Sequence, residues 1–102
     1  MTPRKFISTV KSNILSIDKN AEIVLFGSRA RGDQRPDSDW DFLILTSFPE
    51  SEQNERTIQE KLFYVELESA QAISAIIHSK KYWRKLKITS LYQNIAKEGK
   101  KI

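Results

Sequence analysis

Apolar side chains recur at helical spacing in three stretches of the chain. Residues three to four positions apart lie on one face of a helix, so this spacing predicts amphipathic helices that bury one side. The predicted helices are residues 3–19 (with Phe6, Val10, Ile14 and Ile17 on the buried face), residues 51–69 (Ile58, Leu62 and Val65), and a last helix from a cap at Thr89 or Ser90 to Gly99 (Leu91 and Ile95).

Shorter β-prone runs separate these helices. They predict strands over residues 22–26, 39–46 and 72–77, with a brief helical turn at 28–32 and a loop at 33–38. Beyond Asp41 the second strand is continuously apolar, which predicts cover on both of its faces. The order helix, strand, short helix, strand, helix, strand, helix predicts an α/β or α+β two-layer fold with a small mixed sheet. A chain of 102 residues fits one domain over residues 1–102.

The end of the second long helix has two interpretations. Phe63, Val65 and Leu67 alternate with Tyr64, Glu66 and Glu68, which is a strand pattern within a stretch that also has helical spacing. We favour a helix to about residue 69, followed by the strand over 72–77. The choice matters because it decides where the carboxylate of Glu66 lies.

Composition narrows the functions that the chain can have. The sequence contains no cysteine and one histidine, which excludes thiol chemistry and argues against a zinc site built from several histidines. The formal net charge of +4 attracts phosphates, whether in nucleotides, in nucleic acid or on an acidic partner. No apolar run approaches the ~20 residues of a membrane span, and no apolar signal core follows Arg4 and Lys5, so we expect a cytoplasmic protein with no membrane partner.

Two carboxylates stand at the start of the second predicted strand. Because strand side chains alternate, Asp39 and Asp41 point to the same face, while Trp40 points to the other and can anchor the strand in the core. Neighbouring carboxylates repel each other, and a divalent cation relieves that repulsion. Magnesium suits such a pair because it takes one or two carboxylates together with substrate phosphates.

A Gly-Ser turn lies ten residues before the carboxylate pair. Gly27 allows close approach to the backbone, and the free amides and hydroxyl that begin with Ser28 can hold a phosphate. Arg29 and Arg31 supply positive charge and forked donors for the same phosphates. Phosphoryl or nucleotidyl transfer requires phosphate-binding groups beside metal ligands.

Two segments resemble the signature of minimal nucleotidyltransferases in the DNA polymerase β superfamily: Phe26-Gly27-Ser28-Arg29-Ala30-Arg31-Gly32 and Ser38-Asp39-Trp40-Asp41-Phe42. The element order and residues 91–99 also look like the ending of these domains, so the resemblance spans nearly the whole chain. It implies a nucleoside triphosphate substrate, usually ATP, held by Gly27 and Ser28, and two Mg²⁺ ions bound through Asp39 and Asp41. Many such bacterial domains pair with a small all-helical HEPN-type protein in a toxin–antitoxin module, and some transfer AMP onto that partner and silence it.

The chain departs from this family at the third carboxylate, which active members carry on a later strand. The predicted strand 72–77 has Ser74 at the inward position and no acidic residue. If residues 63–68 were the strand instead, Glu66 would fit as the third catalytic carboxylate. On the favoured helical interpretation, Glu66 and Glu68 lie on a solvated helix face.

Three functions therefore compete. The first is a nucleotidyltransferase that moves NMP, in particular AMP from ATP, to a hydroxyl group on a protein partner. The second is a catalytically weak nucleotide-binding module that acts as an antitoxin by binding its partner. The third is a nucleic-acid-binding protein that uses its basic surface, although no nucleic-acid-binding signature occurs in the sequence. Transfer of label from ATP separates the first two, and salt-dependent oligonucleotide binding tests the third.

Overall fold

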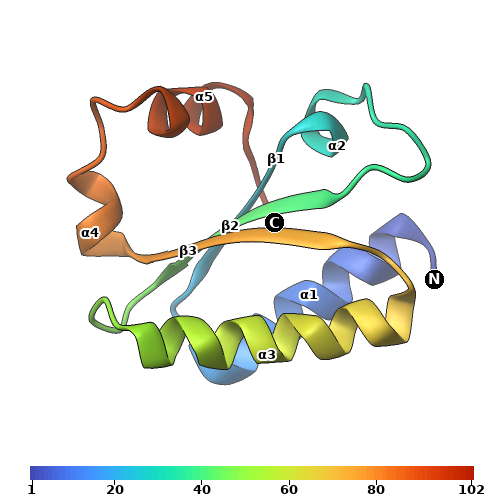
Figure 1. The fold of residues 1–102 in the computed structure, drawn as a ribbon, viewed down its shortest axis with the longest axis horizontal. Helices are drawn as coiled ribbons and strands as arrows, with labels where there is room; N and C mark the ends of the chain where they lie inside the picture. Colours follow the sequence, from blue (N-terminus) through green and yellow to red (C-terminus); the bar gives the residue numbers. More distant parts are fainter.

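The computed structural model describes every residue from Met1 to Ile102. It contains five helices and four strands, arranged as Figure 1 shows. The helices are α1 (Pro3–Ile17), α2 (Ser28–Arg31), α3 (Glu52–Ser69), α4 (Lys80–Arg84) and α5 (Ser90–Glu98). The strands are β1 (Glu22–Phe26), β2 (Trp40–Thr46), β3 (Ile73–Ser79) and β4 (Lys100–Lys101).

The four strands form one mixed sheet in the order β3-β2-β1-β4. Strand β2 is parallel to β3 and antiparallel to β1, and β4 pairs with the other side of β1 in the antiparallel sense. Because β1 and β2 run in opposite directions, the end of β1 meets the start of β2, and Phe26 is paired with Asp41. On its other side Asp41 is in register with Ser74 of β3. This topology brings the Gly-Ser turn beside the carboxylate pair.

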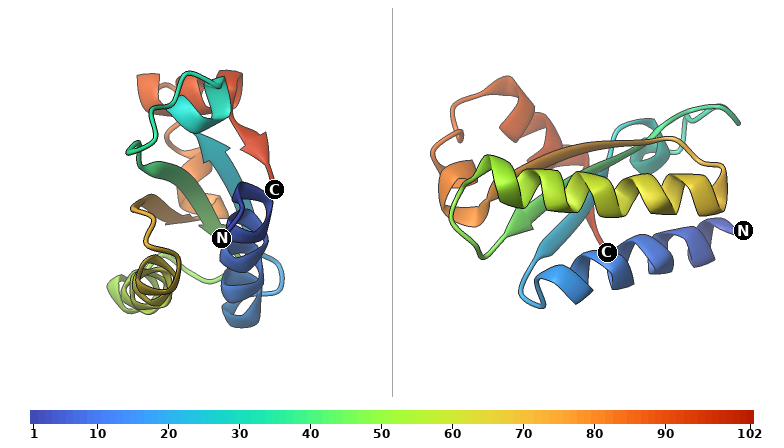
Figure 2. Two further views of the ribbon diagram at one scale, coloured as in Figure 1. Left: turned by 90° about the vertical axis from the view of Figure 1, so that its right-hand side faces the viewer. Right: turned by 60° about the horizontal axis from the view of Figure 1, so that its bottom comes forward.

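Helices α1 and α3 cover one face of the sheet (Figure 2). The larger hydrophobic core lies between them and the sheet, and its centre is aromatic. The ring of Phe6 lies 4.8 Å from that of Trp40, and the Trp40 and Phe42 rings stack at 6.4 Å. The predicted anchoring of the second strand by Trp40 is confirmed, because its side chain is buried and its indole N–H donates to Gln71 Oε1 at 3.0 Å.

Helices α4 and α5 lie on the opposite face of the sheet (Figure 1). Leu43 and Leu45 of β2 pack there against Trp83 of α4 and Ile95 of α5, in a second and smaller core. These contacts explain the continuous apolar run of β2, since both of its faces are buried. They also add a partial third layer to the two that the sequence predicted.

The predicted elements occur within two residues of their expected bounds. Residues 63–68 belong to α3, which confirms the helical interpretation of that stretch. Helix α4 and strand β4 were not predicted, because elements of five and two residues are too short to show a periodic pattern. Helix α4 begins after Ser79, whose hydroxyl accepts a hydrogen bond from the Tyr82 amide at 3.0 Å.

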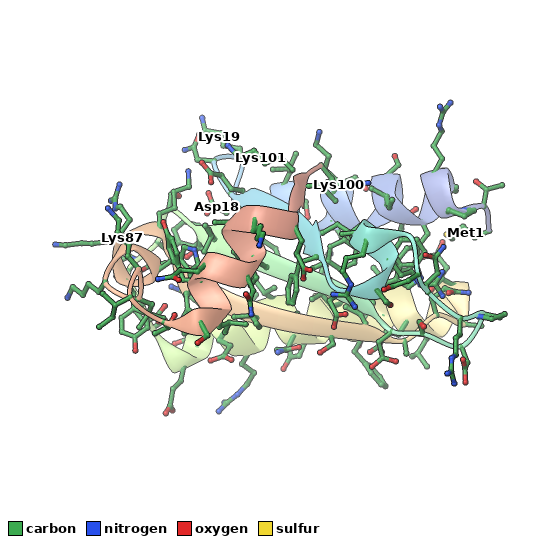
Figure 3. All side chains as sticks on the ribbon, turned by 90° about the horizontal axis from the view of Figure 1, so that it is seen from above. Met1, Asp18, Lys19, Lys87, Lys100 and Lys101 are labelled. Carbon is green, nitrogen blue, oxygen red and sulfur yellow. The ribbon has the colours of Figure 1, made fainter.

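None of the helices has the length and apolar character that crossing a bilayer demands. Charged side chains project around the periphery, with Lys87 and Met1 at opposite ends of the molecule (Figure 3). A basic run over residues 80–87 begins in α4 and comprises Lys80, Lys81, Arg84, Lys85 and Lys87. It lies apart from the arginines of α2, since α4 and α2 are on different sides of the fold (Figure 1).

Candidate functional site

Asp41 is the second residue of β2, and Asp39 directly precedes the strand. Asp41 is half-buried, Asp39 is exposed, and no protein donor lies within hydrogen-bonding distance of either carboxylate. Burial raises the pKa of Asp41 above its usual value; the negative charges of Asp39 and Glu98 raise it further, and the positive charge of Arg31 opposes them. Asp41 is therefore a half-buried carboxylate beside a second one, and Arg31 offsets only part of this negative charge.

Gly27 separates β1 from α2 and has a backbone conformation that side chains rarely adopt, with φ 73° and ψ −159°. A Cβ atom at this position would overlap the Asp41 carboxylate. We predicted that Gly27 permits close approach of a ligand to the backbone. The structure shows that the close neighbour is Asp41, so the absence of a side chain at Gly27 holds the turn and the carboxylate together.

Ser28 opens α2, and neither its amide nor its hydroxyl has a hydrogen-bond partner in the protein. Its carbonyl accepts from Gly32 and Asp33, which closes the short helix. The first amides of a helix have no intrahelical acceptor, so Ser28 offers two donors to a ligand. Because Phe26 is paired with Asp41, these donors lie beside the carboxylate pair.

Arg29 is positioned differently from Arg31. Its guanidinium lies 4.4 Å above the Trp40 ring and donates to the Ser38 carbonyl at 2.9 and 3.2 Å. A further hydrogen bond at 3.3 Å reaches the Pro36 carbonyl. Arg29 was predicted to contact phosphate, and in the structure its donors hold the loop that leads into Asp39. These contacts set the position of the carboxylate pair relative to α2.

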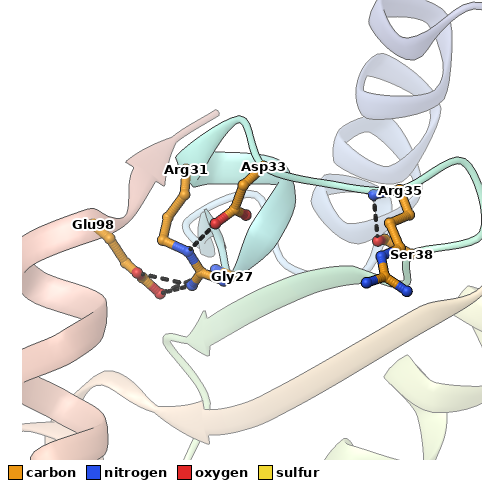
Figure 4. Close-up of polar contacts among 6 residues, drawn as sticks. All are labelled: Gly27, Arg31, Asp33, Arg35, Ser38 and Glu98. Atoms are coloured by element: carbon orange, nitrogen blue, oxygen red, sulfur yellow. Dashed lines mark hydrogen bonds and ion pairs between the residues drawn. The ribbon is translucent and has the colours of Figure 1, made fainter.

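Arg31 and the Gly27 amide share one acceptor, the carboxylate of Glu98 at the end of α5 (Figure 4). The Gly27 amide donates to Glu98 Oε1 at 3.2 Å, and Arg31 Nη1 contacts Oε1 at 3.3 Å and Oε2 at 3.1 Å. Arg31 Nε also pairs with Asp33 at 3.3 Å. Hydrogen bonds to Glu98 and then Asp33 raise the pKa of Arg31, which keeps this guanidinium charged.

Sequence reasoning did not identify Glu98 as a site residue. It is 71 positions from Gly27, and its sequence context is an ordinary amphipathic helix that ends at a glycine. The only available signal was the resemblance of residues 91–99 to the ending of nucleotidyltransferase domains. That resemblance suggested family membership but assigned no role to this carboxylate.

Glu66 does not join the carboxylate pair in the structure. It lies in α3, and its Oε2 accepts a hydrogen bond from the Ile73 amide at 2.9 Å, where β3 begins. Ser74, in register with Asp41, is exposed on the face where a third carboxylate was expected. No three acidic or histidine side chains are grouped so that they could hold a metal ion by themselves. The catalytic role predicted for Glu66 thus stays a prediction, and its observed contact positions the first residue of β3.

Two cavities lie away from this end of the sheet. One, of about 370 Å³, lies under α5 and is lined by residues that include Leu43, Trp83 and Ile95. The other, of about 580 Å³, lies beyond the end of β2 beside the basic residues of α4. Neither contains Gly27, Ser28 or the carboxylate pair. The Gly-Ser turn and the carboxylates therefore form a separate site at the opposite end of β2.

The mixed sheet thus places a Gly-Ser turn next to a carboxylate pair at the start of β2, the arrangement expected from the resemblance of the sequence to nucleotidyltransferases. Residues 4–102 match the family described as the nucleotidyltransferase domain, and the chain belongs to this family. No curated protein gave a significant match to the sequence.

Solved structures with this fold include several toxin–antitoxin proteins. A chain from a toxin–antitoxin complex with AMP-PNP is 23% identical, with a TM-score of 0.62, and the match covers 99% of the present chain and 72% of that chain. Two mutants of the MntA–HpeT toxin–antitoxin complex match at 20% and 22% identity, each with a TM-score of 0.59 and 72% of that chain covered. Those matches cover 99% and 100% of the present chain. At these identities the likeness shows the shared fold.

Proposed function

We propose that this chain, as a single domain over residues 1–102, is a magnesium-dependent nucleotidyltransferase that transfers AMP from ATP to a hydroxyl group on a protein partner. Membership of the nucleotidyltransferase family supports a transferase role. The observation that carries the proposal is the unpaired carboxylate pair beside unpaired donors. Asp39 and Asp41 have no protein donor, and Ser28 at the adjoining turn has no protein acceptor.

The residues present fit the ligands that the proposal requires. Asp39 and Asp41 would hold Mg²⁺, because two carboxylates together with substrate phosphates suit this ion. The Ser28 amide and hydroxyl, the Gly27 amide and Arg31 would hold the triphosphate. Bound magnesium supplies positive charge that offsets the charge of the reacting phosphates.

The transfer itself forms one bond and breaks another. The acceptor oxygen forms a bond to the α-phosphorus of ATP, and the bond from that phosphorus to the bridging oxygen breaks. Pyrophosphate leaves with the electron pair, and the acceptor hydroxyl transfers its proton to solvent water. The protein's contribution is to position the triphosphate in line with the acceptor and to stabilise its charge, which is the main source of catalysis in this class of reaction.

In this proposal the protein partner is the toxin of a toxin–antitoxin pair. The structural neighbours are toxin–antitoxin proteins, and one of those complexes contains AMP-PNP. The resemblance of the sequence to minimal nucleotidyltransferases suggests the rest of the proposal: the acceptor would be a small helical protein of the HEPN type, and the present chain the antitoxin, acting in the cytoplasm.

The alternative function is an antitoxin that binds nucleotide and partner but catalyses poorly. One observation favours it: Ser74 occupies the position in register with Asp41, and the carboxylate of Glu66 contacts the Ile73 amide. A site with two carboxylates in place of three binds a magnesium–nucleotide complex and lacks a side chain to accept the proton of the attacking hydroxyl.

Label transfer from α-labelled ATP separates the two functions. The chain is incubated with Mg²⁺, the labelled ATP and a candidate partner, a small helical protein if the neighbouring gene encodes one, and label on that protein is measured. We expect transfer by the wild type and none by Asp39→Asn or Asp41→Asn. Asp37→Asn is the matched control, because Asp37 is exposed in the same loop and has no polar contact. Intact partner binding without any transfer would instead establish the binding-only antitoxin.

A further inference from the structure

The two donors that Glu98 engages are donors that the proposed function assigns to the triphosphate. The Gly27 amide and the Arg31 guanidinium both contact the Glu98 carboxylate, at 3.1 to 3.3 Å (Figure 4). A carboxylate resembles one edge of a phosphate, with two oxygens that accept from an amide and a guanidinium. Glu98 therefore holds the turn in the way that a bound anion would.

The fold fixes the position of Glu98 from both sides. Ile95, one helical turn earlier, is buried against β2, and the Gly99 amide donates to the Ile95 carbonyl at 2.7 Å. Immediately afterwards Lys100 pairs with Leu25 in the sheet. Gly99 is packed so closely against Ile95 and Val24 that a Cβ there would overlap both. The backbone at Glu98 is thus held in place, while its side chain is 25% exposed and has solvent on one side.

The location of this carboxylate is unfavourable on electrostatic grounds. The negative charge of Glu98 lies close enough to Asp41 to raise its pKa further, and Asp41 has no hydrogen-bond donor from the protein. In return Glu98 satisfies the Gly27 amide and pairs with Arg31. A triphosphate accompanied by a divalent cation would satisfy the same two donors and also neutralise the aspartates. The triphosphate and Glu98 would therefore compete for the Gly27 amide and the Arg31 guanidinium.

We propose that Glu98 is a built-in competing anion: it occupies the phosphate donors Gly27 and Arg31 in the free protein, and the triphosphate displaces it on binding. The inference rests on the proposed function, since it assumes that these donors receive phosphate. Its consequence is that nucleotide affinity is weaker than the site would allow without the carboxylate. Binding also moves the side chain at the junction of α5 and β4.

Calorimetric titration with AMP-PNP and Mg²⁺ tests the displacement. Glu98→Gln removes the charge, and Glu98→Asp keeps the charge on a side chain one methylene shorter. We expect both variants to bind about tenfold more tightly than the wild type, the change expected when one charge-assisted hydrogen bond no longer competes. Lys97→Gln, an exposed substitution on the same helix, is the control and should stay within about twofold of the wild type.

The two variants separate displacement from a general effect of charge. If the negative charge of Glu98 merely repels the nucleotide, Glu98→Gln binds more tightly and Glu98→Asp does not, which overturns the proposal. If Glu98 instead supports the turn, both variants bind more weakly, which also overturns it. Circular dichroism of each variant before titration establishes that it is folded.

The amide resonance of Gly27 gives a readout that affinity alone does not. In the free proteins this resonance should differ between the wild type and Glu98→Gln, and at nucleotide saturation the two should coincide. A difference that persists at saturation means that Glu98 keeps its contact, and the inference is wrong. If the wild type binds AMP-PNP and the Glu98 variants bind it with equal or lower affinity, only this inference is rejected. If neither the wild type nor any variant binds AMP-PNP, the proposed function is rejected as well.

Discussion

An aspartate lies near each end of β2, fully buried at one end and half-buried at the other, and the two differ in their hydrogen bonding. At the far end, Asp18 follows α1 and lies against Ser47, just beyond the strand. At the near end, Asp41 lies against the Gly27 turn. Asp18 is surrounded by donors, and Asp41 has none from the protein. The comparison separates a carboxylate that holds the fold together from one that is available to a ligand.

Asp18 is 4% exposed and makes three hydrogen bonds. Its oxygens accept from the Ser47 amide at 2.7 Å, the Ser47 hydroxyl at 2.8 Å and the Asn20 amide at 3.0 Å. Burial by itself would raise the pKa of Asp18, but these hydrogen bonds and the charge of Lys80 outweigh burial and lower the pKa. Asp18 thus joins the end of α1 to the end of β2, and its charge is already satisfied.

Asp41 shows the reverse balance. Burial raises its pKa, and the nearby carboxylates add to the effect, with only Arg31 opposing them. A desolvated carboxylate beside another one is unfavourable for folding and favourable for cation binding. The contrast indicates that a metal ion would bind at Asp41 and not at Asp18.

The largest effect is expected from Gly27→Ala. The glycine conformation is accessible to almost no other residue, and the new methyl group would overlap Asp41. We expect a loss of about 3 kcal/mol in the free energy of unfolding, together with loss of nucleotide binding. Gly32→Ala is the matched control, because Gly32 also has a positive φ but open space at its Cβ, and it should cost only about 1 kcal/mol. Urea denaturation measures both, and equal losses would show that the contact between turn and carboxylate has no special importance.

Asp18→Ala should lower the free energy of unfolding by about 2–3 kcal/mol, because it leaves the Ser47 amide without its acceptor. The stabilisation also depends on pH. Since the folded pKa of Asp18 lies below its unfolded value of 3.8, its contribution is present above that value and is lost as pH falls through the folded pKa. Denaturation of wild type and variant between pH 7 and pH 2 should therefore give curves that converge in acid. A constant difference across that range would contradict this role.

Asp41→Asn should act in the opposite direction and raise the melting temperature at pH 7 without magnesium. Because its folded pKa lies above its unfolded value of 3.8, the contribution of Asp41 to stability is present below that value and is lost as pH rises through the folded pKa. The neutral amide removes the unfavourable charge, so the gain should disappear in acid. Thermal denaturation at pH 7 and pH 3 measures it, and a lower melting temperature at pH 7 would show that Asp41 stabilises the fold.

The smallest effect is expected from Glu66→Gln. The amide oxygen of glutamine still accepts from the Ile73 amide, so the free energy of unfolding should fall by less than about 1 kcal/mol. Label transfer to the partner should stay within about twofold of the wild type. If transfer is lost while the fold is intact, Glu66 is the third catalytic carboxylate that the sequence predicted, and its contact with Ile73 is broken during the reaction.

The sequence predicted most of the fold because the long elements have one buried face. Phe6, Val10 and Ile14 show the helical period directly, and the apolar run of β2 indicated cover on both sides. The ten residues between Ser28 and Asp39 are enough to bring the turn beside the carboxylates, and the antiparallel pairing of β1 with β2 places them there. Elements as short as α4 and β4 bury too few residues to give a pattern.

Contacts between distant residues could not be predicted in this way. Glu98 reaches the Gly27 amide across 71 positions, and Asp18 reaches Ser47 across 29, with no local signal at either end. The contacts of Arg29 within the protein were not predicted, for a related reason. An arginine beside a phosphate-binding turn suggests phosphate contact, and only the fold reveals that Trp40 and the Ser38 carbonyl engage its guanidinium first.

Magnesium-dependent nucleotide binding is the most direct test of the role given to the unpaired carboxylates. Calorimetry would compare AMP-PNP binding to the wild type and to Asp41→Asn, each with Mg²⁺ and with the chelator EDTA. The account predicts binding by the wild type with Mg²⁺, and little or none by the wild type in EDTA or by Asp41→Asn in either condition. Equal affinity in all four titrations would mean that Asp41 does not hold a metal for the nucleotide, and would contradict the account.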